Sequence, residues 1–405
     1  MPTFYNFRQN GLDYSFDDIF VPADLFREGT LWTWGSGSFG RLGNAQGSNR
    51  STPVTTFAGG TNWKQVSSGG YHTAAIKTDG TLWTWGYGSN GQLGTYLFPT
   101  NPIRVTPITT FAGGTNWKQV SAGYQHTAAI KTDGTLWTWG YGGNGRLGTY
   151  IIPTNPNRVT PITTFAGGTN WKQVSCGGYF TAAIKTDGTL WTWGGNYNGQ
   201  LGTNDTTSRS TPVTTFAGGT NWKQVSCSNN VLGHHTAAIK TDGTLWTWGN
   251  SAYGRLGNAT DEFSSILTPV TTFAGGTNWK QVSCNQHHTA AIKTDGTLWA
   301  WGNGQDGRLG NGLVSFSDRI STPVTTFAGG TNWKQVSAGS QHIAAIKTDG
   351  TLWIWGTGFN GRLGNAVTTG NISTPITTFA GGTNWKQVSA GYQHTAATTY
   401  EDPVL

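Results

Sequence analysis

The chain is poor in the residues that build disulfide frameworks and membrane spans. Its 405 residues include three cysteines and one methionine, and only 11% of the residues are charged. Three cysteines do not suggest a disulfide framework, so they do not identify a redox compartment. No apolar run approaches the length of a transmembrane helix, and the first residues lack a basic region followed by an apolar core. We therefore expect no membrane span and no secretion signal.

What the chain does have is a sevenfold repeat, marked by all 21 of its tryptophans. Seven copies of G-T-L-W-x-W-G alternate with seven copies of F-A-G-G-T-N-W-K-Q-V-S. The first tryptophans of successive G-T-L-W-x-W-G copies lie 51 to 55 residues apart, so no unit is lost. Self-similarity at such a period is typical of a solenoid, a propeller or an array.

One unit is predicted to form four short antiparallel strands. Residues 72–78 alternate in polarity, Asp79-Gly80 is a tight hairpin turn, and 81–85 form the next strand. Further strands follow at 106–111 and 117–121. A proline recurs in the third of these strands, which indicates an edge strand because proline lacks an N–H. The seven prolines are Pro53, Pro107, Pro161, Pro212, Pro269, Pro323 and Pro375.

The two ends of the chain complement each other. The chain enters the repeat at 27–32 without the two strands that normally come before, and it stops at 385–397 without the two that normally follow. We therefore predict an all-β, seven-bladed β-propeller of four-stranded antiparallel blades, closed by a composite blade from N- and C-terminal strands. The predicted organisation is an acidic, aromatic-rich arm at 1–28, the propeller at 29–399 and a tail at 400–405.

The motif H-T-A-A-I-K-T-D-G-T-L-W-T-W-G and the string N-G-Q-L-G at 90–94 resemble the repeat of the regulator of chromosome condensation family. The resemblance covers nearly the whole chain. It implies a seven-bladed propeller with K-Q-V-S innermost and T-P-V-T-T outermost in each blade. The resemblance leaves the activity open between two classes. The family's founders are exchange factors for a small nuclear GTPase and bind nucleosomes, while other members are scaffolds, adhesion or regulatory modules.

The net charge of +7 follows the repeat. All 13 lysines lie in N-W-K-Q and I-K-T-D-G segments that also hold six aspartates, and 13 − 6 = +7. The other 12 acidic residues balance the 12 arginines. We interpret the lysines as solvated groups partly paired with the turn aspartates; the alternative is a basic ring that binds an anionic polymer. Since the charge is spread evenly, we do not expect nucleic acid as a partner.

Sequence variation is confined to two of the four connections in each unit. The T-F-A-G-G-T-N-W connection and the K-T-D-G-T turn are identical in every copy, whereas the loops after K-Q-V-S and after W-G change. In an antiparallel blade, these two variable connections emerge on the same face of the disc. Variable loops on a rigid framework are typical of a recognition scaffold.

Aromatic and apolar side chains in the variable loops are the candidate ligand-binding residues. Such side chains amid Asn, Ser and Gly are typical of paratope-like surfaces and sugar-stacking sites. The alternative is that the loop tips pack on neighbouring blades or seal a gap in the disc. The candidates are Tyr71, Tyr96, Phe98, Tyr124, Tyr150, Ile152, Tyr179, Phe263, Phe316 and Tyr392.

Catalytic and metal-binding patterns are weak. Six units begin their second strand with histidine and one with Phe180, which favours a hydrogen bond that fixes the local loop. Cys176, Cys227 and Cys284 share one position that holds Ser or Ala in the other copies, which indicates small-residue packing; a metal clip with His234 or His287 is the alternative. No carboxylate pair or nucleophile with a base can be assembled from the spacing. We expect no enzymatic activity and no cofactor.

These patterns favour a non-enzymatic binding scaffold whose variable loop face engages a protein or a glycan. The arm at 1–28 packs on the propeller or on an anchoring protein. The composition also fits an exposed virion component, such as a phage tail or receptor-binding protein. The alternative is a guanine-nucleotide exchange or chromatin-associated regulator like the family founders. The arm disfavours it, because the arm has five acids against two arginines, unlike the basic tail that reaches DNA phosphates.

Overall fold

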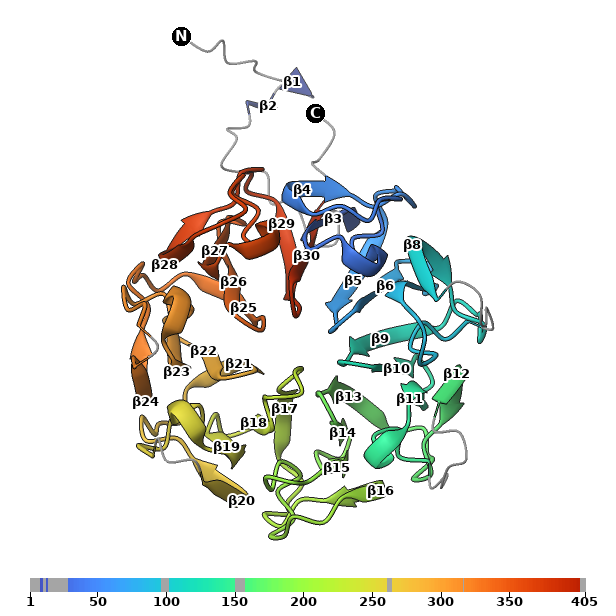
Figure 1. Ribbon diagram of the computed structural model, residues 1–405, viewed down its shortest axis with the longest axis vertical. Helices are drawn as coiled ribbons and strands as arrows, with labels where there is room; N and C mark the ends of the chain where they lie inside the picture. The colour runs from blue at the N-terminus through green and yellow to red at the C-terminus, as the bar shows by residue number, and fades with distance from the viewer. Residues whose placement is uncertain are drawn as a thin grey trace.

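The computed structural model is an all-β, seven-bladed propeller (Figure 1). It describes residues 28–95, 102–149, 157–260, 264–315 and 317–400, together with two short paired strands, β1 (Arg8–Gln9) and β2 (Leu12–Asp13). The predicted fold class is confirmed. Most of residues 1–28 and all of residues 401–405 lie outside the described part of the chain. What the arm at 1–28 packs on therefore stays a prediction.

Six blades are continuous in the chain, and the order of their strands in the sheet follows their order in sequence. Blade 1 is β5 (Trp63–Ser68), β6 (His72–Lys77), β7 (Leu82–Tyr87) and β8 (Ile103–Thr109). Blade 2 is β9 (Trp117–Ala122), β10 (His126–Lys131), β11 (Leu136–Tyr141) and β12 (Asn157–Thr163). Blade 3 is β13 (Trp171–Cys176), β14 (Phe180–Lys185), β15 (Leu190–Gly194) and β16 (Arg209–Thr214).

Blades 4 to 6 repeat this order. Blade 4 is β17 (Trp222–Cys227), β18 (His235–Lys240), β19 (Leu245–Asn250) and β20 (Ser265–Thr271). Blade 5 is β21 (Trp279–Asn285), β22 (His288–Lys293), β23 (Leu298–Asn303) and β24 (Arg319–Thr325). Blade 6 is β25 (Trp333–Ala338), β26 (His342–Lys347), β27 (Leu352–Thr357) and β28 (Asn371–Thr377). Short 3₁₀ turns follow some third strands: η3 (Ser38–Gly40), η4 (Gly143–Gly145), η5 (Ala252–Gly254), η6 (Gln305–Gly307) and η7 (Phe359–Gly361).

The seventh blade joins the two ends of the chain, as predicted. Its inner strands are β29 (Trp385–Ala390) and β30 (His394–Tyr400), and its outer strands are β3 (Glu28–Gly35) and β4 (Arg50–Thr55). Strand β3 pairs antiparallel with β30, so that Trp32 lies opposite Ala397. We call this the composite blade. It places the N- and C-terminal parts of the propeller side by side (Figure 1).

The tryptophans form the core between blades. In blade 1, the ring of Trp63 meets those of Trp83 and Trp85 edge-on, with centroids 6.2 and 6.3 Å apart. The indole N–H of Trp85 donates to the carbonyl of Arg41, which belongs to the composite blade, at 2.9 Å. Each blade therefore buries an aromatic face that it could not bury alone, and it satisfies the indole N–H through its neighbour.

The innermost strands are clamped together by the Q and S of K-Q-V-S. Gln65 donates to the carbonyl of Val120 in the next blade at 3.1 Å and accepts from the N–H of the same residue at 3.0 Å. The equivalent pair joins every blade junction, and Gln387 with Val66 closes the ring at 3.0 and 2.9 Å. This clamp explains why the glutamine of K-Q-V-S is identical in all seven units.

Five of the six repeated histidines contact the next blade, which the prediction of a bond to the local loop did not include. His235 makes the predicted local contact as well, with Nδ1 3.2 Å from the Gly233 carbonyl. His72 Nε2 lies 2.7 Å from the hydroxyl of Thr127 in the next blade, and that hydroxyl donates to the Gln92 carbonyl at 2.8 Å. The histidine Nε2 therefore carries the proton and donates. Junctions with the same contact are His126–Thr181, His235–Thr289, His342–Thr395 and His394–Thr73.

The lysines of I-K-T-D-G contact tryptophan rings rather than the turn aspartates. Lys77 Nζ lies 4.8 Å from the ring centroids of both Trp63 and Trp83. Asp79 instead accepts hydrogen bonds from the N–H and hydroxyl of Thr81 at 2.8 and 2.6 Å. The predicted pairing is therefore not a direct ion pair at these positions, because the tight turn directs the carboxylate toward Thr81; Lys77 acts on Asp79 only through its nearby charge. Cation–π contacts of this kind stabilise by roughly 0.5–1 kcal/mol when exposed.

Candidate binding face

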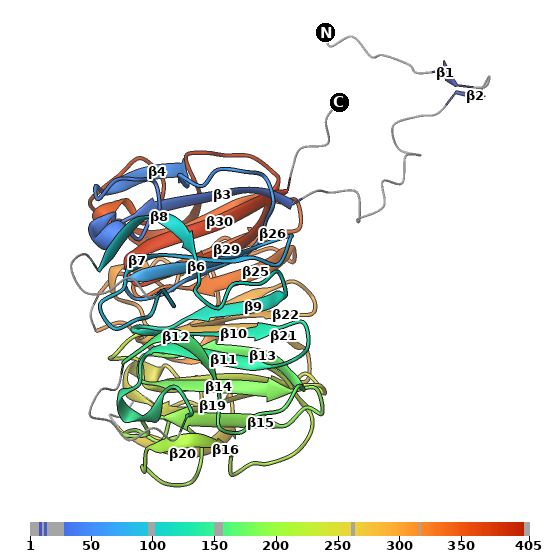
Figure 2. The same cartoon turned by 90° about the vertical axis from the view of Figure 1, so that its right-hand side faces the viewer.

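The propeller has two different faces. The loops between first and second strands and between third and fourth strands form what we call the variable face. The second-to-third turns and the connections to the next blade form the uniform face. In the side view, the two faces lie at opposite ends of the strands (Figure 2). Strand β3 begins at Glu28 and β30 ends at Tyr400 on the uniform face, so the chain enters and leaves the propeller opposite the variable loops.

The longest first loop, at 228–234 in blade 4, crosses the mouth of the central channel. Asn229 Nδ2 donates to the carbonyls of Ser68 in blade 1 and Ala122 in blade 2, at 3.3 and 2.8 Å. We call this loop the plug. It exposes the side chain of Leu232, which is 56% accessible. An apolar side chain is therefore presented near the centre of the variable face.

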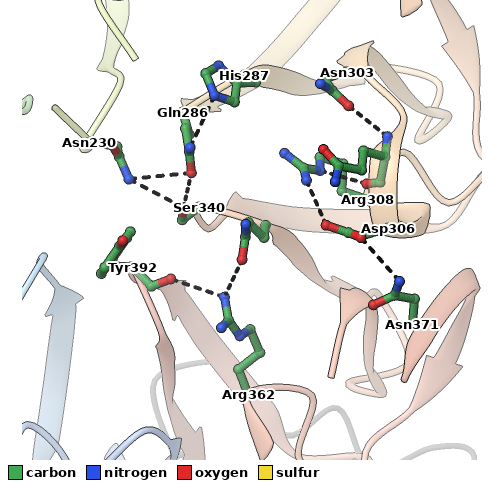
Figure 3. A network of polar contacts seen from close by, with 12 residues as sticks. Asn230, Gln286, His287, Asn303, Asp306, Arg308, Ser340, Arg362, Asn371 and Tyr392 are labelled. Atoms are coloured by element: carbon green, nitrogen blue, oxygen red, sulfur yellow. Dashed lines mark hydrogen bonds and ion pairs between the residues drawn. The ribbon is translucent and has the colours of Figure 1, made fainter. Parts of the chain in front are cut away.

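The plug is also tied to the opposite side of the channel (Figure 3). Asn230 Nδ2 lies 3.4 Å from Gln286 Oε1 in blade 5 and 3.3 Å from Ser340 Oγ in blade 6. Ser340 in turn donates to Gln286. These contacts join the first loops of three neighbouring blades, so the plug is held on both sides of the channel.

Three of the candidate tyrosines form a cluster beside the plug. The hydroxyls of Tyr71 and Tyr124 are 2.6 Å apart, and their ring centroids are 4.9 Å apart. The ring of Tyr392 lies 6.1 and 6.0 Å from those two rings. The ring of Tyr179 instead stacks on that of His234 in the plug, with centroids 5.5 Å apart. All four side chains are half-buried.

The remaining sequence candidates belong to the loops between third and fourth strands. They lie outside the described residues, so their role in binding stays a prediction. These residues are Tyr96, Phe98, Tyr150, Ile152, Phe263 and Phe316.

A ring of buried arginines lies beneath the variable face, and the sequence reasoning did not single it out. Each arginine precedes the L-G of the third connection, where two other units have glutamine. Arg41 Nη1 donates to the Gly70 carbonyl of the next blade at 3.2 Å, and Arg146 Nη1 to that of Gly178 at 2.8 Å. We call the set the inner arginine ring; no member is more than 2% exposed. Its members are Arg41, Arg146, Arg255, Arg308 and Arg362.

Most of these cations have no carboxylate partner. Within the described ranges, only Arg308 is paired, with Asp306 at 2.9 Å (Figure 3). Burial lowers the pKa of Arg41 and of Arg362 to about 10 and that of Arg255 to about 9. These groups therefore remain positively charged at neutral pH. The alternation of Arg and Gln before L-G was the available sequence signal.

Nothing in the described part of the chain resembles a metal centre. Cys176, Cys227 and Cys284 are buried free thiols, as expected of a small-residue packing position. Among the described residues, no three His, Cys, Asp or Glu side chains are grouped so that they could hold a metal ion. No helix in that part of the chain is long and apolar enough to cross a membrane.

Comparison with known proteins agrees with the propeller and its repeats. The RCC1-like domain family matches residues 23–328, and regulator of chromosome condensation (RCC1) repeats match 333–362 and 349–398. The chain therefore belongs to the RCC1-like domain family. It is 34% identical over 292 residues to the ultraviolet-B receptor UVR8 of Arabidopsis thaliana, covering 70% of this chain and 62% of that protein.

Another relative and two solved structures also match most of this chain. The E3 ubiquitin-protein ligase HERC2 of Mus musculus is 27% identical over 381 residues, which are 92% of this chain and 8% of that protein. The structure of Prp20p from Saccharomyces cerevisiae superimposes with a TM-score of 0.79 at 18% identity, covering 93% of this chain and 92% of that one. Human WBSCR16 has a TM-score of 0.78 at 20% identity, covering 91% and 99%.

Proposed function

We propose that the protein is a non-enzymatic binding scaffold whose variable face binds a protein partner. The main support is the centre of that face, where the plug presents Leu232 at 56% exposure beside the tyrosine cluster. An exposed apolar side chain next to aromatic and polar groups matches the usual make-up of protein interfaces. The uniform face offers no such variation between units.

The relatives make a protein partner plausible for this class of propeller. Prp20p has binding properties toward Gsp1p and histones, and another structure contains Kap60 bound to yeast RCC1 (Prp20). These partners are those of Prp20p. Because its sequence identity to this chain is low, the comparison shows that the two proteins share a fold and does not show that they share partners. We adopt from it only the general class of partner, a protein.

We prefer a protein to a glycan because of how the tyrosines pack. Sugar stacking needs an open aromatic face, whereas Tyr71, Tyr124 and Tyr392 are half-buried against one another. A virion role was suggested by composition alone and is not part of the proposal. Residues 1–28 remain a proposed attachment segment, since they join the propeller on the face opposite the plug.

Affinity capture from an extract of the source cells tests this proposal. The wild type should retain one or more proteins that Leu232→Asp loses, because a carboxylate would replace the apolar anchor. Phe327→Asp is the matched control, since it introduces the same carboxylate at a side chain that is 75% exposed in a connection of the uniform face. Equal loss with both variants would contradict the proposal. Faster nucleotide release from a small nuclear GTPase would favour the exchange-factor alternative instead.

A further inference from the structure

The arginines of the propeller are separated in the sequence from most of the acids that balance them in number. Ten of the 12 arginines lie between residues 29 and 399, all within or next to the connections between third and fourth strands. Five acids occupy the same connections, so 10 − 5 = +5. The other seven acids lie at 1–28 and 401–402. The balance over the whole chain therefore hides a net positive charge in the third-to-fourth connections that belong to the variable face.

The inner arginine ring concentrates this charge near the channel. Arg41, Arg146, Arg255 and Arg362 are held by carbonyl or amide oxygens instead of carboxylates. The guanidinium group of Arg255 donates to three carbonyls, those of Leu232, Gly233 and Gln286, at 3.0, 2.6 and 2.9 Å. Charges in such a poorly solvated layer are weakly screened, so their field extends to the surface above them.

The positive charge is not needed for the structural contacts of this position. Gln92 occupies it in blade 1, and its carbonyl accepts from Trp139 Nε1 at 2.9 Å and from the Thr127 hydroxyl at 2.8 Å. The Arg41 carbonyl makes the same two contacts, with Trp85 and Thr73. The fold therefore accepts a neutral side chain here, although burial of an arginine costs desolvation free energy.

Polar groups between the inner arginine ring and the surface can act as hydrogen-bond donors to a negatively charged ligand. Arg362 Nη1 donates to Gln341 Oε1 at 3.3 Å, which leaves the amide N–H groups of Gln341 to donate elsewhere. Between Tyr71 and Tyr124, one hydroxyl donates to the other, and the second hydroxyl retains its proton for another acceptor. Both sets of donors are half-buried on the variable face.

We infer that the variable face docks an acidic protein segment, with the inner arginine ring supplying the attraction and Leu232 an apolar contact. Carboxylates need not touch the buried guanidinium groups, because donors oriented by the ring lie between them. This inference rests on the proposed function and names the chemistry of its partner.

Fluorescence anisotropy with a labelled oligoglutamate peptide, at low and high salt, tests the inference on the full chain. Arg41→Gln/Arg362→Gln copies the neutral residue of blades 1 and 3 and should weaken binding by about tenfold or more. Arg41→Lys/Arg362→Lys keeps the charge and should stay within about threefold of wild type. Gln92→Arg/Gln200→Arg should tighten binding several-fold, a gain that impaired folding could not produce.

Lys64→Gln/Lys118→Gln is the matched control, because it removes the same charge from exposed side chains near the uniform end of the inner strands. It should change affinity by less than about twofold. Three results would overturn the inference. The first is equal weakening by Lys64→Gln/Lys118→Gln and Arg41→Gln/Arg362→Gln. The others are no binding of oligoglutamate, and equally tight arginine-dependent binding of a DNA oligonucleotide. If oligoglutamate fails but a Leu232-dependent protein is captured, the proposed function stands and only the acidic partner is wrong.

Discussion

The uniform and variable faces lie at opposite ends of the same strands, but their polar residues make different kinds of contact. On the uniform face, the charged groups of the repeated I-K-T-D-G turn contact their own unit, as Lys77 does with two tryptophans and Asp79 with Thr81. On the variable face, Asn229 reaches other blades, Leu232 is exposed, and four of the five inner-ring arginines are held by carbonyl or amide oxygens instead of carboxylates. Identity between units therefore identifies the framework, and departure from identity identifies the surface available for recognition.

The strongest break of the framework should come from a tryptophan at the composite blade. Trp34 is fully buried, lies edge-on to Trp385 at 6.2 Å and donates to the Arg362 carbonyl at 2.9 Å. Trp34→Ala should lower the free energy of unfolding by about 3–5 kcal/mol, measured by denaturant titration. Phe327→Ala should change it by less than about 0.5 kcal/mol. Similar losses in both variants would mean that the blade faces are not the core.

A smaller loss is expected from the clamp that closes the ring. Gln387→Ala leaves the N–H and carbonyl of Val66 without their partners, and we expect a loss of about 1–3 kcal/mol. Gln119→Ala removes the same clamp between two continuous blades and should cost the same. A neutral Gln387→Ala beside a costly Gln119→Ala would show that the composite blade does not close the ring.

Acid should weaken the framework through the buried histidines. Burial lowers the pKa of His72 to about 3, against about 6.5 when unfolded. The unfolded chain binds more protons between these values, so stability is complete above pH 6.5 and falls as pH drops toward 3. His72→Phe, which copies Phe180, should cost about 1 kcal/mol at pH 7 but reduce the acid loss by up to about 1.4 kcal/mol per pH unit.

Thermal melts across this pH range provide the measurement, and His288→Phe is the control. Both ring nitrogens of His288 lack a hydrogen-bond partner, because the next blade has Ile343 where Thr127 and its equivalents stand. His288→Phe should cost nothing at pH 7 and should reduce acid sensitivity like His72→Phe. Unchanged pH dependence in both variants would refute the role of the histidines.

The smallest effect on stability should come from the plug tip. Leu232→Ala should change the free energy of unfolding by less than about 0.5 kcal/mol, because the side chain is mostly exposed. It should nevertheless weaken capture of the partner. A stability loss comparable with that of Gln387→Ala would assign Leu232 to the framework and remove it from the binding face.

The repeat made the blades, the edge prolines and the composite blade predictable, because each follows from strand periodicity and chain order. The histidine–threonine contacts were not predicted, since they depend on the rotation between blades. The lysine–tryptophan contacts were missed because Asp79 is nearer in sequence than Trp63, although the turn points its carboxylate away.

The binding face was only partly predictable. Loop variation correctly indicated which connections differ, and Tyr71, Tyr124 and Tyr392 do lie together. The path of the plug was not predictable, because loop length does not define which blades Asn229 reaches. The inner arginine ring was missed since a count over the whole chain cancels arginines against acids that lie outside the propeller.

Site-specific photocrosslinking is the most direct test of the claim that recognition belongs to the variable face. A photoreactive amino acid would replace Leu232 in one variant and Phe327 in another, and both would be irradiated in the source cells. We predict a discrete protein adduct from position 232 and none from position 327. Adducts from position 327 alone, or the same adducts from both positions, would contradict the account.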